Sequence, residues 1–255
     1  MINPSELAGS PPADTEVPEG LRNMLHGIGL GDAHLRPVWI NNGGGLTFAI
    51  AGGGADSAAD LYVKWNPANS GESLLDEAER LQWVQGRHPA PSVVEVISNE
   101  TEEILLTRAL PGESAVWGRW IDQPKTVLRA LGEGLRQLHD VPLETCPFDW
   151  GVEPRVRSAQ LDTRQLGTPP PIDELVLCQG DPCAPNTLLA ADGSFLAHVD
   201  LARLGAADRW ADLAVMSMSL EWNYRDYDES VFWEAYGIEP DPLRIRFYRK
   251  LWNAE

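Results

Sequence analysis

The residues best suited to chemistry lie between positions 179 and 214. Asp181 and Asn186 are five residues apart after a short apolar run, and Asp200 follows a second apolar run. Phosphoryl transfer from a nucleoside triphosphate uses such a set. One carboxylate orients the acceptor hydroxyl and accepts its proton, while a carboxylate and an amide oxygen hold Mg²⁺ against the phosphates. Mg²⁺ prefers hard oxygen ligands and keeps several waters, so two side chains suffice.

The Asp-to-Asn spacing alone is a weak signal, because a loop aspartate often caps its own turn. Protein kinases combine H-R-D-x-x-x-x-N with a later D-F-G aspartate. This chain has G-D-x-x-x-x-N at 180–186 and V-D-L-A-R at 199–203. Upstream lie a glycine run and Lys64, the only lysine among the first 124 residues. A solvated strand lysine and ordinary hairpin glycines are the alternatives, but together the features favour phosphoryl transfer.

The first 110 residues predict a small antiparallel sheet with one inserted helix. Residues 1–20 are acidic and proline-rich, which is typical of a flexible arm, and a short helix is expected at 21–30. A second glycine cluster at 52–54 predicts another turn. Helical spacing of apolar residues marks 72–86. Strand-like runs occur at the following positions: 37–50 around the glycines, 61–65, 92–98 and 103–110.

The remainder of the chain is mainly helical in pattern. Residues 126–139 form an amphipathic stripe, whereas 140–174 are rich in proline and lack periodicity. Short apolar runs at 175–178 and 195–199 flank the chemical residues. Further helices are expected at 210–221, 229–236 and 242–252. We therefore expect an α+β fold with three parts: an arm at 1–20, a β-rich lobe at 21–110 and a helical lobe at 111–255.

Three segments resemble the aminoglycoside phosphotransferases, in particular the 3′- and 3″-phosphotransferases. They are L-C-Q-G-D-P-C-A-P-N at 177–186, H-V-D-L-A-R-L-G at 198–205 and A-D-R-W-A-D-L-A at 207–214. The last is much more specific than the general kinase pattern. E-R-L-Q-W-V-Q-G at 79–86 and T-C-P-F-D-W at 145–150 also look like family segments, so the resemblance covers roughly 36–252. It implies a two-lobed, protein-kinase-like fold.

The resemblance also implies roles for individual residues. Asp181 is expected to be the catalytic base, with Asn186 and Asp200 as magnesium ligands. Lys64 is expected to contact the α- and β-phosphates and to pair with Glu77, with Glu79 as the competing partner. The loop that covers the nucleotide is expected to use Gly43, Gly44, Gly45 and Thr47. The hinge that meets the purine is expected to use Thr107, Arg108 and Leu110.

This chain departs from the family pattern in three places. Gln179 replaces the usual histidine before Gly-Asp, and the 151–174 segment is short. The C-terminal stretch is less acidic than in many members, with Asn253 where an acid is expected. Asp208 and Asp212 are expected to be structural, and Arg203 to support the active-site loop. Carboxylates remain as candidates for binding the amino groups of an acceptor: Asp162, Glu221, Asp226 and Glu255.

Composition narrows the class of partner. The chain has 255 residues, 38 Asp and Glu against 20 Lys and Arg, and a formal net charge of −18. Such acidity argues against nucleic acid or a membrane as partner and suits a cationic ligand or simple solubility. The three cysteines cannot form a disulfide framework, and no signal peptide or spanning segment is recognisable. We expect a cytoplasmic protein that is a monomer or weak dimer.

The expected activity is transfer of the γ-phosphate of ATP, or of GTP, with Mg²⁺ as cofactor. The expected acceptor is a hydroxyl of an aminoglycoside, and resistance is the expected outcome. One alternative is a small-molecule kinase of the same superfamily that acts on a sugar, an amino alcohol or another antibiotic. The other is a nucleotide-binding regulator without turnover, although Asp181, Asn186, Asp200 and Lys64 are all present.

Overall fold

The computed structural model describes residues 9–51, 58–68 and 70–255, and these residues form two compact units. The first unit contains the chain up to Gln85 together with Pro91–Leu110, and the second contains Gly86–Ala90 and Pro111–Glu255. The boundary between Leu110 and Pro111 falls inside the expected hinge. Residues 1–8 of the expected arm and the glycine cluster at 52–54 lie outside the described residues. Gly9 forms a bridge to Ile40.

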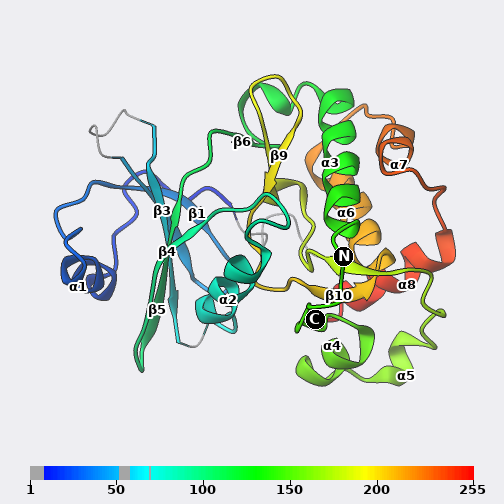
Figure 1. Ribbon diagram of the computed structural model, residues 1–255, viewed down its shortest axis with the longest axis horizontal. Coiled ribbons are helices and arrows are strands. Elements are labelled where there is room, and N and C mark those ends of the chain that lie inside the picture. The colour runs from blue at the N-terminus through cyan, green and yellow to red at the C-terminus, as the bar shows by residue number, and fades with distance from the viewer. Residues whose placement is uncertain (1–8, 52–57, 69) are drawn as a thin grey trace. The chain divides into compact units, whose positions relative to one another are not determined.

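The first unit is built on a five-stranded antiparallel sheet of order β1-β2-β3-β5-β4 (Figure 1). Every strand run predicted for this part of the chain is confirmed. Two helices accompany the sheet, α1 (Glu19–Gly27) and α2 (Leu74–Val84). The strands are β1 (Leu35–Ile40), β2 (Leu46–Ile50), β3 (Leu61–Pro67), β4 (Val93–Ser98) and β5 (Glu102–Arg108).

Alternation along β5 assigns the two helices to opposite faces of the sheet. Ile104 and Leu106 are buried in a cluster with Leu21 and Leu25 of α1. Leu105, also fully buried, points to the other face because successive strand side chains alternate. Figure 1 shows α1 and α2 on opposite sides of the sheet. Lys64 pairs directly with Leu105 and therefore shares the face that α2 covers.

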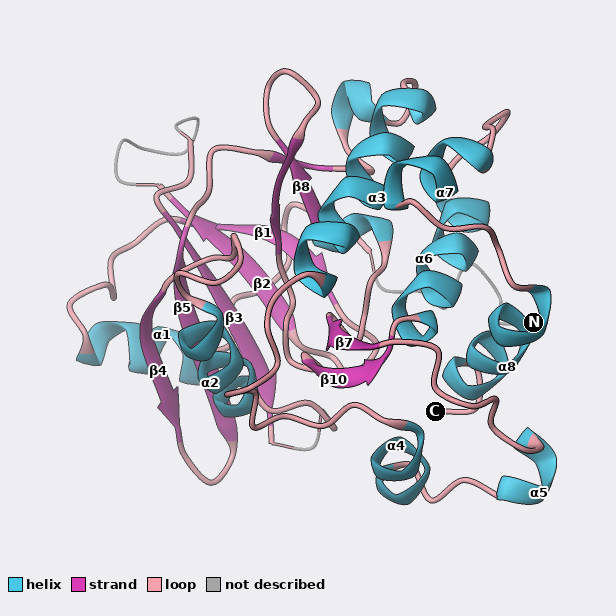
Figure 2. Cartoon of the chain, turned by 45° about the vertical axis from the view of Figure 1, so that its right-hand side comes forward, coloured by secondary structure: helices cyan, strands magenta, loops and turns pink. Residues whose placement is uncertain are grey.

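The second unit is mainly helical, with two small sheets of order β10-β7 and β6-β8-β9 (Figure 2). Its strands are β6 (Glu113–Ser114), β7 (Leu175–Cys178), β8 (Thr187–Leu189), β9 (Phe195–His198) and β10 (Gly205–Asp208). Its α-helices are α3 (Pro124–His139), α4 (Val152–Ser158), α5 (Thr163–Leu166), α6 (Trp210–Asn223), α7 (Ser230–Tyr236) and α8 (Pro242–Trp252). The α+β fold class is thus confirmed.

Five of these helices and strands were not predicted by the sequence analysis, and all are short; one of them is β8, with three residues. Helices α4 and α5 lie in the segment that lacks periodicity, because two turns or fewer contain too few residues to show a period. Strands β6 and β10 have two and four residues. Each is defined by its pairing with a strand elsewhere in the chain, β8 and β7 respectively. A local pattern cannot reveal such pairing.

The core of the second unit is formed where α3 packs on α7 and α6 packs on α8. Gly132 makes the first contact possible, since a Cβ there would lie 2.6 Å from the carbonyl oxygen of Phe232 in α7. Helix α6 is buried along most of its length, from Trp210 to Leu220. A helix that is buried on all sides in this way presents no polar face to solvent along that length. Among the described residues, no helix has the length and apolar character needed to cross a membrane.

Candidate active site

A sharp turn after β7 presents Asp181. Gly180 has φ +85°, a left-handed conformation that glycine adopts without strain. A Cβ at Gly180 would lie 2.3 Å from the carbonyl oxygen of Arg203. Glycine is therefore required at position 180 for two reasons: the left-handed backbone conformation and the close approach of the loop after Asp200. The expectation that Arg203 supports this loop agrees with that contact.

Hydrogen bonds hold the main chain of the Asp181 loop. The carbonyl oxygen of Asp181 accepts from the Cys183 amide at 2.7 Å and from the Asn186 side-chain Nδ2 at 3.0 Å. The Asn186 amide donates in turn to the Cys183 carbonyl at 2.9 Å. Oδ1 of Asp181 accepts from the Cys183 thiol at 3.1 Å. The Asp-to-Asn spacing thus closes a compact loop.

Asp200 is brought beside this loop by the β8–β9 pairing. Thr187 faces His198 across the ladder, and the amide of Val199 donates to the carbonyl oxygen of Asn186 at 2.9 Å. Asp200 itself has φ +60°, which is uncommon for a residue other than glycine. Such strained backbone persists only where surrounding contacts enforce it and is concentrated at functional sites.

The Asn186 and Asp200 side chains have the donor chemistry of a magnesium site. Because Nδ2 of Asn186 is used by the Asp181 carbonyl, the amide oxygen is directed to the opposite side of the group. Asp200 supplies a carboxylate. Carboxylate and amide oxygens on adjacent segments suit Mg²⁺, which takes few protein ligands and keeps waters. The residues therefore fit the ion that the family resemblance implies.

Lys64 and Glu77 form an ion pair in the first unit. Nζ of Lys64 lies 2.7 Å and 2.8 Å from the two carboxylate oxygens of Glu77. The Lys64 side chain is 25% exposed, whereas that of Glu77 is 3% exposed. Glu79, the competing partner, is exposed on α2. The structure therefore pairs Lys64 with Glu77, from strand β3 to helix α2.

The glycine run forms the turn between β1 and β2. The Gly45 amide donates to Oδ1 of Asn41 at 2.6 Å, and Gly44 has φ +80°. A Cβ at Gly43 would lie 2.5 Å from the Ser70 carbonyl oxygen. The turn is thus packed tightly against the chain after β3, and the Gly45 amide is already used within the unit. Thr47 follows in β2.

Thr47 lies directly opposite Lys64 on the neighbouring strand, so β2 and β3 place a hydroxyl beside the ion pair. At the predicted hinge, Thr107 and Arg108 are the last residues of β5. The Arg108 amide donates to the Ser92 carbonyl at 3.0 Å. Leu110 is the last residue of the first unit. Lys64, Glu77, Thr47 and the predicted hinge thus lie on one sheet and one helix.

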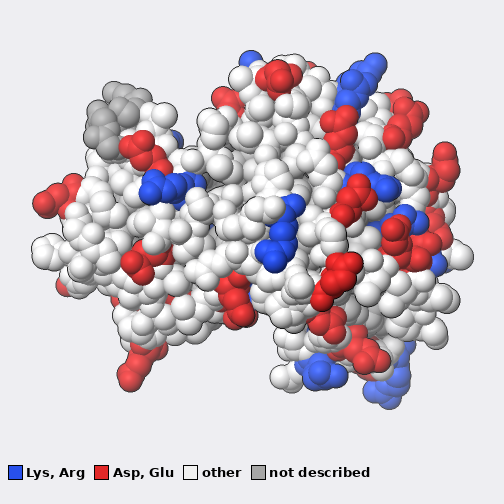
Figure 3. All heavy atoms as spheres, in the orientation of Figure 1, with Lys and Arg blue, Asp and Glu red and all other residues white. Residues whose placement is uncertain are grey.

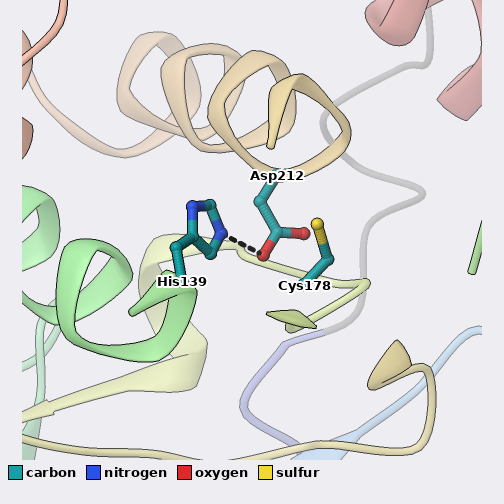
Figure 4. Close-up of side chains that lie close together, drawn as sticks. All are labelled: His139, Cys178 and Asp212. Carbon is teal, nitrogen blue, oxygen red and sulfur yellow. Dashed lines mark hydrogen bonds and ion pairs between the residues drawn. The ribbon is translucent and has the colours of Figure 1, made fainter. Parts of the chain in front are cut away.

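Asp212 of α6 supports the Asp181 loop from behind. Its fully buried carboxylate accepts from the Gln179 amide at 2.6 Å and from the Gly180 amide at 3.1 Å. Nε2 of His139 lies 3.2 Å from the same carboxylate (Figure 4). The interpretation of Asp212 as a structural residue is therefore correct. The structure adds that its carboxylate holds the backbone of the Asp181 loop. The Gln179 side chain donates to the Val199 carbonyl at 3.0 Å and links the two loops.

His139 and Cys178 belong to the same buried cluster, and sequence reasoning missed both. The ligand atoms of His139, Cys178 and Asp212 lie within 4.8 Å of one another. Nδ1 of His139 is bonded to the Tyr236 hydroxyl at 2.8 Å. Burial, with the nearby Asp212 and Asp208 charges, raises the pKa of Cys178 well above its ordinary value. The hydrogen bonds of Asp212 and His139 show that this cluster supports the loop from behind.

The predicted acceptor carboxylates are scattered and mostly paired. Asp162 caps α5 and pairs with Arg164, whose hydrogen bonds lower the pKa of Asp162. Oε1 of Glu221 lies 2.6 Å from Nη1 of Arg249. Asp226 is exposed, with φ +51°. Within the described part of the chain, the contacts of Asp162 and Glu221 are to arginines, and none joins these carboxylates to one another.

Glu255 is bound by a buried arginine. Its carboxylate accepts from Nε and NH2 of Arg155 at 2.7 Å and 3.0 Å, and the Arg155 side chain is 1% exposed. The Arg155 guanidinium also lies 4.9 Å from the centre of the Trp150 ring. This pair ties the end of the described chain to α4. Glu255 therefore already neutralises a buried cation, which weakens its assignment to substrate amines.

An open groove of about 720 Å³ lies among α6, α7 and α8. Glu221 and Glu229 line it together with three cations, Arg246, Arg249 and Lys250. Burial raises the pKa of Glu229 above its ordinary value. The groove therefore carries both signs of charge, and Glu221, a candidate for binding acceptor amines, shares it with three cations.

The chain is similar to known phosphotransferases. Residues 45–248 match the model of the phosphotransferase enzyme family. Streptomycin 3″-kinase of Streptomyces griseus is 31% identical, over 94% of this chain and 97% of its own. An aminoglycoside 3′-phosphotransferase of Streptomyces fradiae is 32% identical, over 83% and 92%.

Solved structures give the same result. The aminoglycoside phosphotransferase APH(3″)-Id of Streptomyces rimosus superposes with a TM-score of 0.74 and 26% identity, over 94% of this chain and 99% of that one. The same enzyme in complex with ADP and streptomycin gives a TM-score of 0.74 at 25% identity. The predicted protein-kinase-like fold is confirmed. The loop geometry, the family match and these structures together show that this chain belongs to the phosphotransferase enzyme family.

Proposed function

We propose that this protein transfers the γ-phosphate of ATP to a hydroxyl of an aminoglycoside. The observation that carries the proposal is the compact loop that sets Asp181, Asn186 and Asp200 on adjoining segments. Two relatives act on aminoglycosides by name, and one similar structure holds ADP and streptomycin. Streptomycin is therefore the first acceptor to test. A strongly acidic chain, with a net charge of −18, favours approach of a polycation.

In this proposal Asp181 orients the acceptor hydroxyl and accepts its proton as the oxygen attacks the γ-phosphorus. Asn186 and Asp200 would hold Mg²⁺, which neutralises negative charge on the phosphates when it is bound. Lys64, kept in place by Glu77, contacts the α- and β-phosphates. The Thr47 hydroxyl and the β1–β2 turn lie on the sheet that presents Lys64. ATP is expected as donor, with GTP as the competing nucleotide.

Purified protein tests the proposal directly. We expect Mg²⁺-dependent ADP production with ATP and streptomycin. The product should be heavier than streptomycin by one phosphoryl group, about 80 Da. Asp181→Asn is expected to lower kcat by about 10²- to 10⁴-fold, the usual contribution of a general base. A panel of kanamycin, streptomycin and capreomycin separates acceptor classes, with ATP and GTP compared in parallel.

The matched control is Asp192→Asn, which removes an exposed carboxylate from the β8–β9 turn of the same unit. It should leave kcat unchanged. Turnover with none of the drugs, together with no protection of a susceptible host, would overturn the aminoglycoside assignment. Turnover only with unrelated alcohols would assign the chain to another kinase of the superfamily. Mg·ATP binding without turnover on any acceptor would indicate a nucleotide-binding regulator.

A further inference from the structure

We propose that the Cys183 thiol is a positioning residue that orients the Asp181 carboxylate by donating a hydrogen bond to it. The inference rests on the proposed function, in which Asp181 is the catalytic base. Sγ of Cys183 lies 3.1 Å from Oδ1 of Asp181, well within the distance of a sulfur hydrogen bond. The proposed phosphoryl transfer assigns no role to this contact.

The loop fixes the position of the thiol independently of the carboxylate. The Cys183 amide donates to the Asp181 carbonyl at 2.7 Å, which forms a tight turn over three residues. The amide of the next residue, Ala184, donates to the Ser219 hydroxyl of α6 at 2.9 Å. Nδ2 of Asn223 donates to the same hydroxyl at 3.1 Å. Helix α6 therefore anchors the residue that carries the thiol.

The protonation state of the thiol suits this role. Cysteine thiols have an ordinary pKa of about 8.5 and are mainly protonated at neutral pH, so an S–H group can act as the donor. A carboxylate is free to rotate about its χ2 bond, which has a broad energy minimum. A donor fixed on one oxygen defines the plane of the carboxylate. The other oxygen then has a defined direction toward an acceptor hydroxyl.

The other two cysteines make different contacts. Cys146 donates to the Phe148 carbonyl at 3.5 Å, and the buried Cys178 donates to the Asp208 carbonyl at 3.5 Å. Cys183 is thus the cysteine whose thiol meets a carboxylate of the site. A serine at this position keeps a donor on the same side-chain geometry, whereas alanine and valine remove it.

The experiment compares kcat and both KM values for wild type, Cys183→Ala, Cys183→Val and Cys183→Ser. We expect both variants without a donor to lose kcat roughly threefold to tenfold, the range for one hydrogen bond. The KM values for ATP and aminoglycoside should stay within about twofold of wild type, since orientation of the base acts in the transition state. Cys183→Ser should restore most of the lost kcat. Cys146→Ser serves as the matched control.

Two results would overturn the inference: wild-type kcat in the alanine and valine variants, or an equal loss in the serine variant. Valine fills the space of the thiol, so the valine variant still tests the loss of the donor if the alanine variant folds poorly. Thermal unfolding of each variant checks whether it is folded. Failure of the proposed function looks different. In that case wild type itself phosphorylates no aminoglycoside, or Asp181→Asn retains full activity.

Discussion

The Lys64–Glu77 ion pair is held in one arrangement because its carboxylate is buried. Exposed ion pairs contribute little to stability, because water and salt screen them. Here the carboxylate is 3% exposed and both of its oxygens contact one ammonium group. Removal of either partner would leave a buried or half-buried charge without compensation. Lys64 is therefore held in one position while a quarter of its surface remains open to a ligand.

Glu77→Gln should raise KM for ATP about tenfold or more, because a hydrogen bond to a charged group contributes about 1.5–3 kcal/mol. The substitution keeps the shape of the side chain but removes the charge that orients Lys64. Steady-state kinetics with ATP varied at saturating acceptor measures the effect. Glu79→Gln, on the exposed face of the same helix, is the control and should behave as wild type. Equal effects in both variants would contradict the assignment of Glu77.

At the scale of elements, helix α6 links the interior of the second unit to the Asp181 loop. Its first turn places the buried Asp212 under two loop amides, and Ser219, two turns later, receives the Ala184 amide. His139 joins α3 to this network, and its contact with Tyr236 joins α7. Buried networks of this kind are rigid when every member is satisfied. The Asp181 loop therefore takes its geometry from three packed helices.

Asp212→Asn should lower the free energy of unfolding by about 1–3 kcal/mol, because an amide cannot accept both loop N–H groups and leaves one buried donor unpaired. Urea unfolding at neutral pH measures the loss, and kcat should fall as the loop becomes less ordered. The exposed Asp192→Asn variant serves as the control at this scale as well. An unchanged unfolding midpoint would show that the Asp212 carboxylate does not hold the loop.

At the scale of the molecule, the face drawn in Figure 3 carries both signs of charge despite the net value of −18. In the view of Figure 3, acidic and basic side chains are interspersed over the surface and do not form one acidic field. Arginines neutralise several carboxylates singled out in the sequence, as Arg249 does for Glu221 and Arg155 for Glu255. Much of the negative charge is therefore a general property of the surface, which acts on encounter with a cation rather than on its orientation.

Buried histidines also make stability depend on pH. His88 is 5% exposed, and Nε2 of His88 lies 2.9 Å from Nδ1 of His198. Burial, and then the charge of His139, lower the pKa of His88 from 6.5 to about 4. The unfolded chain binds a proton more readily than the folded one between these values. This contribution to stability is therefore complete above pH 6.5 and declines as the pH falls toward 4.

Unfolding of wild type should thus cost about 2 kcal/mol less at pH 5 than at pH 7 through His88 alone. His88→Gln removes one of two buried titrating groups and should reduce this pH dependence, whatever its effect on absolute stability, while His198, whose pKa burial also lowers, remains. His34→Gln, at an exposed position of the first unit, should retain the wild-type slope. Denaturant unfolding across pH 5–7 makes the comparison. A His88→Gln slope equal to that of wild type would contradict the expectation.

Local patterns were sufficient for the longer elements and for the family. Apolar periodicity predicted α3 and α8, and glycine-punctuated strands predicted the five-stranded sheet. The segment around Asp181 carried the family resemblance. Local patterns did not reveal α4, α5, β6, β8 and β10, which are too short to show a period. They also did not predict that Gly86–Ala90 would belong to the second unit.

Sequence alone therefore determined the fold class and the family, and it singled out Asp181, Asn186 and Asp200 as candidates, because these depend on residue types at fixed spacing along one segment. Tertiary structure decided which residues support them. The choice of Glu77 over Glu79, the Asp212–His139 support and the Arg155–Glu255 pair each join residues distant in the chain or select one helix face. Burial and long-range packing set those contacts, and neither is encoded in local spacing.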